Sequence, residues 1–205
     1  MTNKVLLATF NEGKIERFKS LIAQTGLSVE VFTPADLSIP PIHIEENGSS
    51  LTENAEIKAR AFLGKVDMPI LANDAGFWVE GEGLIEAPKR LALGSHAEES
   101  LSKEQAAILI LDFWKNIACK KGGKVDAAWV ETFVLLDPDG KLHTAESRRE
   151  VTLTDQEFGK PHIQFPMRAL YISKDTNKPA LHHSPQEELL EMKPITDALR
   201  TILSE

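Results

Sequence analysis

The first residues of the chain combine a buried strand, a glycine and a lysine in an order that suits phosphate binding. The apolar run 4–9 predicts a short strand, and residues 10–14 lead directly into an amphipathic helix. The free N–H groups of a helix's first turn attract anions, while Gly13 permits close approach and Lys14 adds a mobile charge. The segment lacks the glycine and hydroxyl positions of a P-loop. Taken alone, a plain strand-to-helix turn with a surface lysine would also explain it.

Two acidic residues and a second lysine could extend this site. Asp74 follows the apolar run 68–72, and ligands of open α/β sheets bind at the carboxyl ends of strands. Glu46 lies in a polar loop, and Lys58 is predicted to lie on a helix. Phosphoanhydride hydrolysis needs donors for the phosphates, carboxylates for Mg²⁺ and a base for water, and these residues offer all three. Each also has a plain interpretation, since Glu46 could be a solvated carboxylate and Lys58 a surface charge.

Hydrophobic periodicity predicts an α/β arrangement in the first half. A helix over 51–65 begins at the capping box Ser50-x-x-Glu53 and places Asn54 and Lys58 on one face. The glycine-rich stretch 76–94 is predicted to be a long functional loop. The other expected elements are a strand over 4–9, a helix over 13–25, a strand over 28–33, and a strand over 68–72 with Asn73 and Asp74 at its C-terminal end.

The second half is predicted to contain a long helix, a hairpin and two short helices. Ser102-x-x-Gln105 starts the strongest helix, 103–120. The turn Asp137-Pro-Asp-Gly140 joins two strands, because proline presets φ and glycine accepts a positive φ. The expected elements are strands over 125–136, 141–152 and 168–173, and helices that start at Ser184-Pro185 and at Lys193-Pro194.

Three linked motifs run through the first eighty residues. They are Asn11-Glu-Gly-Lys14-Ile-Glu16, then Glu45-Glu46-Asn-Gly48 leading to Glu53-Asn54-Ala-Glu-Ile-Lys58-Ala-Arg60, then Leu71-Ala-Asn73-Asp74-Ala-Gly76. In this order and approximate spacing they resemble the inosine triphosphate pyrophosphatase family, the hydrolases that clear damaged nucleotides. Three motifs in order are far more specific than any one of them.

The resemblance implies an α/β fold with a mixed central sheet flanked by helices, two lobes with a cleft between them, and residues 1–205 as a single domain. It implies Mg²⁺-dependent hydrolysis of a (modified) nucleoside triphosphate to the monophosphate and pyrophosphate, by a homodimer. Glu46 and Asp74 match the metal positions, Asp74 also matches the proposed general base, and Lys14 is the second implied catalytic residue. The residues implied to bind the substrate are Thr9, Asn11, Lys14, Asn54, Lys58, Ala75, Arg90, Arg168 and Lys178.

The chain also departs from that family. The family usually has two consecutive aspartates where this chain has Asn73-Asp74, so we expect weaker Mg²⁺ binding. The family's Gly-Phe-Gly-Tyr-Asp-Pro segment and Ser-His-Arg triplet, which frame the purine, are replaced by residues 164–169 and 193–195. A site rejects an analogue that leaves its polar groups unpaired, so changed groups alter base specificity. Arg168 is the best remaining donor for a base carbonyl.

Composition limits the other classes. The 205 residues, 42% of them hydrophobic, fit one ordinary domain, and no apolar run approaches the ~20 residues needed to cross a bilayer. A net charge of −8 opposes binding to extended nucleic acid. The six histidines show no zinc-binding spacing. The N-terminus lacks a signal-peptide pattern and Cys119 is the single cysteine, expected to be structural, so we expect a cytoplasmic location.

Two other functions remain open. Asn73 and the lost C-terminal motifs favour a catalytically silent homologue that binds a nucleotide. The same acids could also serve a phosphatase that releases orthophosphate from another phosphorylated metabolite. The phosphate product discriminates these possibilities, because pyrophosphate implies attack at the α-phosphorus.

Overall fold

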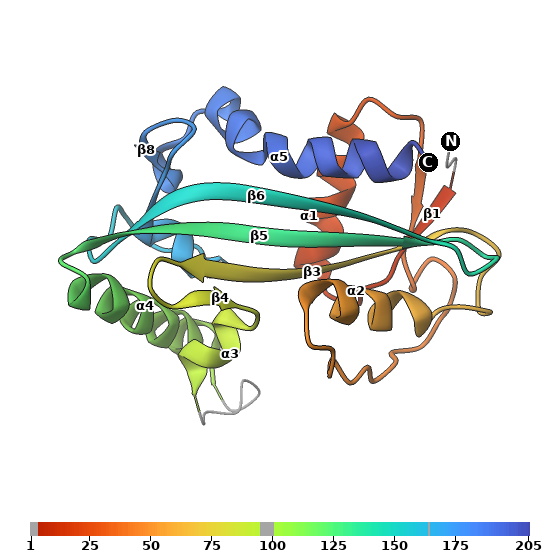
Figure 1. The fold of residues 1–205 in the computed structure, drawn as a ribbon, viewed down its shortest axis with the longest axis horizontal. Helices are drawn as coiled ribbons and strands as arrows, with labels where there is room; N and C mark the ends of the chain where they lie inside the picture. Colours follow the sequence, from red (N-terminus) through yellow and green to blue (C-terminus); the bar gives the residue numbers. More distant parts are fainter. Residues whose placement is uncertain (1–3, 95–100, 164) are drawn as a thin grey trace. The chain divides into compact units, whose positions relative to one another are not determined.

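A computed structural model of the chain describes residues 4–94, 101–163 and 165–205. Eight strands of these residues form one mixed sheet in the order β2-β1-β3-β5-β6-β7-β8, with β4 paired to β3 (Figure 1). The strands are β1 (Lys4–Leu7), β2 (Glu30–Phe32), β3 (Ile70–Val79), β4 (Gly83–Ile85), β5 (Lys124–Leu136), β6 (Leu142–Thr154), β7 (Tyr171–Ser173) and β8 (Lys178–Pro179). The helices are α1 (Glu12–Gln24), α2 (Leu51–Arg60), α3 (Pro88–Leu93), α4 (Lys103–Lys120) and α5 (Pro185–Leu203), with 3-10 helices η2 (Pro166–Leu170) and η3 (Ala180–His182). The predicted mixed sheet flanked by helices is therefore confirmed.

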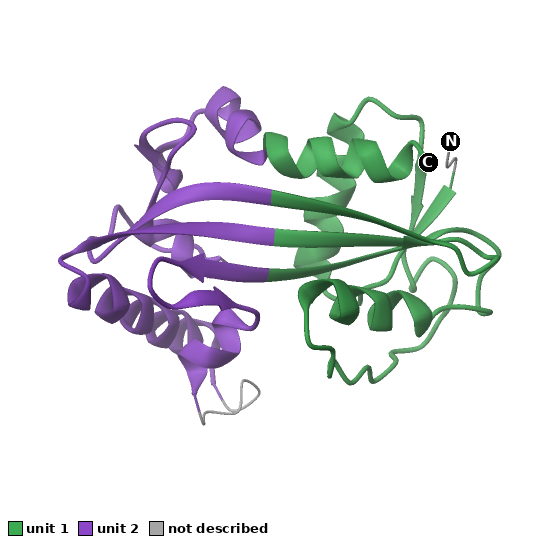
Figure 2. Cartoon of the chain, in the orientation of Figure 1, with its two compact units in different colours: residues 1–75, 131–147, 193–205 green, residues 76–130, 148–192 purple. Residues whose placement is uncertain are grey.

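The chain divides into two compact units (Figure 2). Unit 1 contains residues 1–75, 131–147 and 193–205, and unit 2 contains residues 76–130 and 148–192. Strands β3, β5 and β6 and helix α5 each contribute residues to both units. Each unit is therefore built from segments that are distant in sequence. Among the described residues, no helix is long and apolar enough to cross a membrane.

In unit 1, helices cover both faces of the sheet. On one face, Ala55 of α2 is fully buried in a cluster with Leu6 of β1 and Val134 of β5. On the other face, Phe18 of α1 meets Phe133 of β5 edge to face, with ring centroids 5.7 Å apart. Successive strand residues point to opposite faces, so Phe133 and Val134 belong to two separate layers of core. The strand and helix that carry the amino-terminal motif are thus held by a packed interior.

In unit 2, α4 packs on the sheet as its amphipathic pattern predicts. Both hydrogen bonds of the capping box between Ser102 and Gln105 are present, and the helix runs from Lys103 to Lys120. Trp114 of α4 is fully buried and lies edge to face on Phe77 of β3, with ring centroids 5.2 Å apart. Cys119, near the end of this helix, is exposed and free, and its expected structural role stays a prediction.

Strand β3 is longer than the sequence predicts, which corrects the position of the acidic motif. Asn73 and Asp74 lie inside Ile70–Val79 and not at the end of a strand over 68–72. The strand continues because Phe77 and Val79 are buried and because Phe77 pairs with Ile85 of β4. Gly76 permits this pairing, since a Cβ there would lie 2.9 Å from the carbonyl oxygen of Ile85.

The predicted long loop over 76–94 is also wrong. It contains the end of β3, the strand β4 and the helix α3. Gly81 and Gly83 have φ values of +80° and +82°, which turn the chain from β3 into its antiparallel partner β4. A glycine-rich stretch thus forms a tight turn between strands.

Three other boundaries differ from the prediction. Helix α2 ends at Arg60 and not at residue 65, and residues 166–170 form η2 before the short strand β7. The two helices expected from residues 184 and 193 are one helix, α5, which runs through Pro194. An interior proline costs a helix roughly 3 kcal/mol. Ile195 and Leu199, both fully buried, supply the packing that offsets this cost.

Candidate functional site

The turn between β1 and α1 is organised by its own polar side chains. Oδ1 of Asn11 accepts a hydrogen bond from the backbone N–H of Lys14 at 3.0 Å, so Asn11 is the N-cap of α1. Oγ1 of Thr9 accepts from the backbone N–H of Asn11 at 3.2 Å. The helix begins at Glu12, and its first-turn N–H groups have no partner within the helix. The structure therefore presents the helix start as the sequence predicts, with Thr9 and Asn11 as its supports.

The surroundings of Lys14 disfavour the charged form of its ammonium group. Desolvation by burial lowers the pKa of its ammonium group, and the neighbouring Lys58 lowers it further. Asp74, Glu131 and Glu46 raise the same pKa, but less strongly. A bound polyanion would favour the charged form of Lys14, because an opposite charge nearby stabilises an ammonium group.

Lys58 joins the two predicted metal ligands. Its Nζ lies 2.6 Å from Oδ1 of Asp74 and 3.1 Å from Oε2 of Glu46. The side chains of Lys58 and Asp74 are 12% and 11% exposed, whereas that of Glu46 is 38% exposed. Both carboxylates meet at one cation, although Glu46 and Asp74 are 28 positions apart in the sequence. The structure thus brings the second and third motifs together.

The loop that carries Glu46 is held by the start of α2. Oδ1 of the buried Asn54 accepts from the backbone N–H of Gly48 at 2.9 Å, and Glu53 accepts from the N–H of Ser49 at 2.6 Å. A Cβ at position 48 would lie 2.7 Å from Cβ of Glu53, so the close approach requires glycine. Asn54, predicted to bind the substrate, is engaged in positioning the Glu46 loop.

Asn73 supplies an oxygen that the described residues leave unbonded. Its Nδ2 donates to the carbonyl oxygens of Asp74 and Thr132, both at 3.1 Å. Its Oδ1 is buried and has no hydrogen-bond partner among the described residues. The carboxylate oxygens of Glu46 and Asp74 are further possible metal ligands, and both contact the ammonium group of Lys58. This set of hard oxygen donors fits a hard divalent cation.

A cavity of about 310 Å³ opens among these motifs within unit 1. Its wall combines polar side chains from the motifs with apolar side chains from the core. The polar residues are Thr9, Asn11, Lys14, Glu46, Lys58 and Asn73, and the apolar ones include Leu7, Phe10, Phe18, Ile42, Ile44 and Phe133. Asp74 reaches this group through its contact with Lys58. The cavity therefore has two lysines and hard oxygen donors at hand for a phosphate chain.

The sequence did not reveal a buried ion pair next to the cavity. Arg17 of α1 donates two hydrogen bonds to Glu131 of β5, at 2.7 and 3.1 Å, and the side chain of Glu131 is 2% exposed. The pair lies 114 positions apart in the chain, so no local pattern could have predicted it. It fixes α1 to the sheet and adds negative charge near Lys14.

Three predicted substrate residues belong to unit 2, and Ala75 lies in β3 at the end of unit 1's first segment. Arg90 is exposed on α3. Arg168 donates two hydrogen bonds to Glu188, at 2.6 and 3.0 Å, and one to the carbonyl oxygen of Ala180. Lys178 forms an ion pair with Glu187 at 2.5 Å. A ligand of Arg168 or Lys178 would therefore have to compete with an existing carboxylate.

The fold and this site define an α/β protein in which a strand-to-helix turn with a lysine lies in one unit with two carboxylates that share a cation. The chain belongs to the Ham1 family, whose family model matches residues 5–188. A dITP/XTP pyrophosphatase of Lactobacillus acidophilus is 38% identical over 80 residues, 39% of each chain. One of Corynebacterium efficiens is 28% identical over 158 residues, 76% of this chain and 72% of the relative. The first alignment thus spans about two fifths of that relative's length.

Solved structures show the same fold. The Ham1 protein of Staphylococcus aureus superposes with a TM-score of 0.71 at 21% identity, over 98% of both chains. The family predicted from the three motifs is confirmed.

Proposed function

We propose that this protein hydrolyses a nucleoside triphosphate to the nucleoside monophosphate and pyrophosphate, with Mg²⁺ as cofactor, and thereby clears modified nucleotides. The observation that carries the proposal is the Glu46–Lys58–Asp74 cluster, whose Glu46 and Lys58 line the same cavity as Lys14. Relatives named dITP/XTP pyrophosphatase support it, and the Ham1 family model covers the segment that contains these residues.

Each residue has a distinct role in this proposal. The first turn of α1 and Lys14 bind the phosphate chain, since free N–H groups and an ammonium attract anions. Lys58 exchanges a carboxylate for a phosphate oxygen. Asp74 orients the attacking water and accepts its proton. Glu46, Asp74 and Asn73 would hold Mg²⁺, which when bound neutralises phosphate charge and lowers the pKa of a coordinated water.

The base specificity is proposed to differ from that of the dITP/XTP enzymes. Residues 193–195 lie in the middle of α5, where Ile195 is fully buried and Lys193 pairs with Asp197, so neither offers a base a free donor. Arg168, Arg90 and Lys178 remain proposed substrate contacts. Arg168 could address a base carbonyl once it exchanges Glu188 for the ligand.

A nucleotide screen tests the activity and the specificity together. Inosine, xanthosine, adenosine, guanosine and thymidine triphosphates are supplied with Mg²⁺, and pyrophosphate and orthophosphate are measured separately. We expect pyrophosphate, with poor discrimination between inosine and adenosine triphosphates. Orthophosphate alone would assign a phosphatase, and binding without either product would assign a silent nucleotide-binding protein. A preference for inosine triphosphate of about a thousandfold would contradict the proposed loss of base contacts.

The assembly and location are also proposals. We propose that residues 1–205 act as one functional domain, that the protein is a cytoplasmic homodimer, and that it takes no nucleic-acid or membrane partner. The net charge of −8 supports a small polyanion as ligand over extended nucleic acid. Sedimentation at micromolar concentration should give about twice the chain mass of 22.7 kDa. A mass near that of one chain would contradict the dimer.

A further inference from the structure

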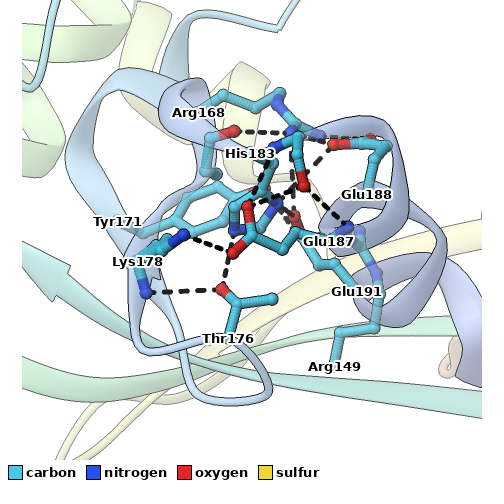
Figure 3. Close-up of polar contacts among 11 residues, drawn as sticks. Arg149, Arg168, Tyr171, Thr176, Lys178, His183, Glu187, Glu188 and Glu191 are labelled. Atoms are coloured by element: carbon cyan, nitrogen blue, oxygen red, sulfur yellow. Dashed lines mark hydrogen bonds and ion pairs between the residues drawn. The ribbon is translucent and has the colours of Figure 1, made fainter.

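Unit 2 contains a polar cluster in which Arg168 and Lys178 are proposed substrate contacts, whereas His183, Glu188 and Glu191 have no role in the proposed reaction. It lies where α5 begins, and Figure 3 shows its side chains converging from α5, from β6 and from the segment before α5. Three of its residues, His183, Glu188 and Glu191, present ligand atoms that all lie within 4.8 Å of one another. They occupy one short stretch of chain, so one helix start sets their geometry.

The imidazole of His183 places its Nδ1 close to the carboxylates of Glu188 and Glu191. Its Nε2 lies 2.8 Å from Oγ1 of Thr176, and its side chain is 1% exposed. With Nε2–H donating to Thr176, Nδ1 keeps its lone pair, the form in which imidazole binds metals. Nδ1 has no hydrogen-bond partner among the described residues, although Oε2 of Glu191 lies 3.1 Å away and Oε2 of Glu188 3.7 Å away. In this tautomer the buried acceptor faces two carboxylates, and a cation between the three groups would relieve their repulsion.

Glu191 divides its two oxygens between different tasks. Oε1 accepts hydrogen bonds from Arg149 and from the hydroxyl of Tyr171, both at 2.9 Å. Oε2 is buried and has no hydrogen-bond partner among the described residues. Burial and the negative charge of Glu191 raise the pKa of Tyr171, which therefore remains a hydrogen-bond donor. One oxygen thus anchors the side chain, and the other is directed at Nδ1 of His183.

Arg168 shows that the cluster attracts a cation. Its Nη2 lies 2.6 Å from Oε2 of Glu188 and 3.6 Å from Oε2 of Glu191. A guanidinium neutralises the carboxylates but leaves Nδ1 of His183 without a hydrogen bond. A metal ion would satisfy all three atoms, and Arg168 would retain its bond to the carbonyl oxygen of Ala180.

We propose that His183, Glu188 and Glu191 form a binding site for a divalent transition metal, of which zinc is the best match. One imidazole and two carboxylates suit zinc, which commonly takes three protein ligands plus water. The metal displaces the guanidinium of Arg168 from the two carboxylates. It ties the residue before α5 to two positions on the helix, so it stabilises the start of α5 in unit 2.

Zinc titration calorimetry tests the site with the full-length protein. Excess Mg²⁺ is present to occupy the Glu46–Asp74 region, and a Cys119→Ser background removes the exposed thiol. We expect His183→Gln and Glu188→Gln to lose one equivalent of bound Zn²⁺, with affinity falling by more than the roughly 10–100-fold that an outer-shell change costs. Glu188 is 42% exposed, so its variant should keep the fold even if His183→Gln does not. Equal uptake by the parent and Glu188→Gln would overturn the proposal.

Two further variants separate this site from adventitious binding. Glu187 lies in the same helical turn, but its carboxylate pairs with Lys178 and is not one of the three proposed metal ligands. Glu187→Gln should therefore leave zinc uptake unchanged. Arg168→Met removes the competing cation, so zinc should bind at least about tenfold tighter. Weaker zinc binding by Arg168→Met would contradict the displacement. These results do not depend on turnover, so they stand apart from the proposed hydrolysis.

Discussion

Replacing Asp74 by asparagine separates the proposed catalytic role of this residue from its structural one. The change keeps the size of the side chain and an oxygen that can accept from Lys58, but it removes the negative charge. Nζ of Lys58 lies 2.6 Å from Oδ1 of Asp74, and both side chains are nearly buried. The substitution therefore converts an ion pair into a hydrogen bond from the ammonium group to a neutral amide oxygen.

The structural cost of Asp74→Asn is small because Lys58 retains a second partner. Hydrogen bonds that involve a charged group contribute about 1.5–3 kcal/mol, and the ammonium keeps one of these to the amide oxygen, so the free energy of unfolding should fall by only about 1 kcal/mol. For a chain of this size that lowers Tm by about 2–4 °C. Glu46, 3.1 Å from the same nitrogen, keeps the ammonium paired. Loss of a general base, in contrast, should lower turnover on the order of a hundredfold or more.

The assay compares Mg²⁺-dependent pyrophosphate release with Tm for the parent, Asp74→Asn and a matched control. Glu56→Gln provides the control, since it removes an equally short ion pair, to Arg60 at 2.6 Å, on the exposed side of α2. We expect the control to keep its activity and Asp74→Asn to lose it at temperatures where both are folded. Turnover of Asp74→Asn within about threefold of the parent would refute the assignment of Asp74.

Three other predictions test the surroundings of Asp74. Glu46→Gln should raise the Mg²⁺ concentration for half-maximal activity roughly tenfold, with rescue by added metal; an unchanged requirement would remove Glu46 from the site. Asn54→Ala, which leaves the N–H of Gly48 without its acceptor, should lower the free energy of unfolding by roughly 1–2 kcal/mol and raise the Mg²⁺ requirement in the same direction. Desolvation and Lys58 lower the pKa of Lys14, so nucleotide affinity should be lost as the pH rises through that lowered pKa. Lys14→Arg stays charged and should keep its affinity at alkaline pH, and identical alkaline losses in the two proteins would contradict the role of Lys14.

Local signals predicted the elements that depend on neighbouring residues. The cap at Ser102 and the turn at Asp137–Gly140 act over a few positions, so helix α4 and the β5–β6 connection match the prediction. The extension of β3 beyond Asp74 is supported by the pairing of residues 77–79 with β4, and helix α5 passes Pro194 because Ile195 is buried. Such tertiary contacts outweigh local propensity and leave no local pattern in the sequence.

In the candidate site, too, local sequence patterns predicted individual residues but not the contacts between distant segments. The motifs predicted Lys14, Lys58 and Asp74 as site residues, but spacing could not show that Lys58 contacts both Asp74 and Glu46. It also could not show that Asn54 holds the Glu46 loop through the N–H of Gly48. These relations arise when segments distant in sequence meet in the folded chain.

Lys58 acts as an internal counter-ion for the two carboxylates, and this favours joint arrival of the ligands. A free dication that approaches Glu46 and Asp74 meets an ammonium group already held at 3.1 and 2.6 Å. A nucleotide brings phosphate oxygens that give the ammonium a new anionic partner, so the carboxylates are released at the same moment. If the proposed function holds, we therefore expect the resting protein to bind a metal–nucleotide complex more readily than a free metal ion.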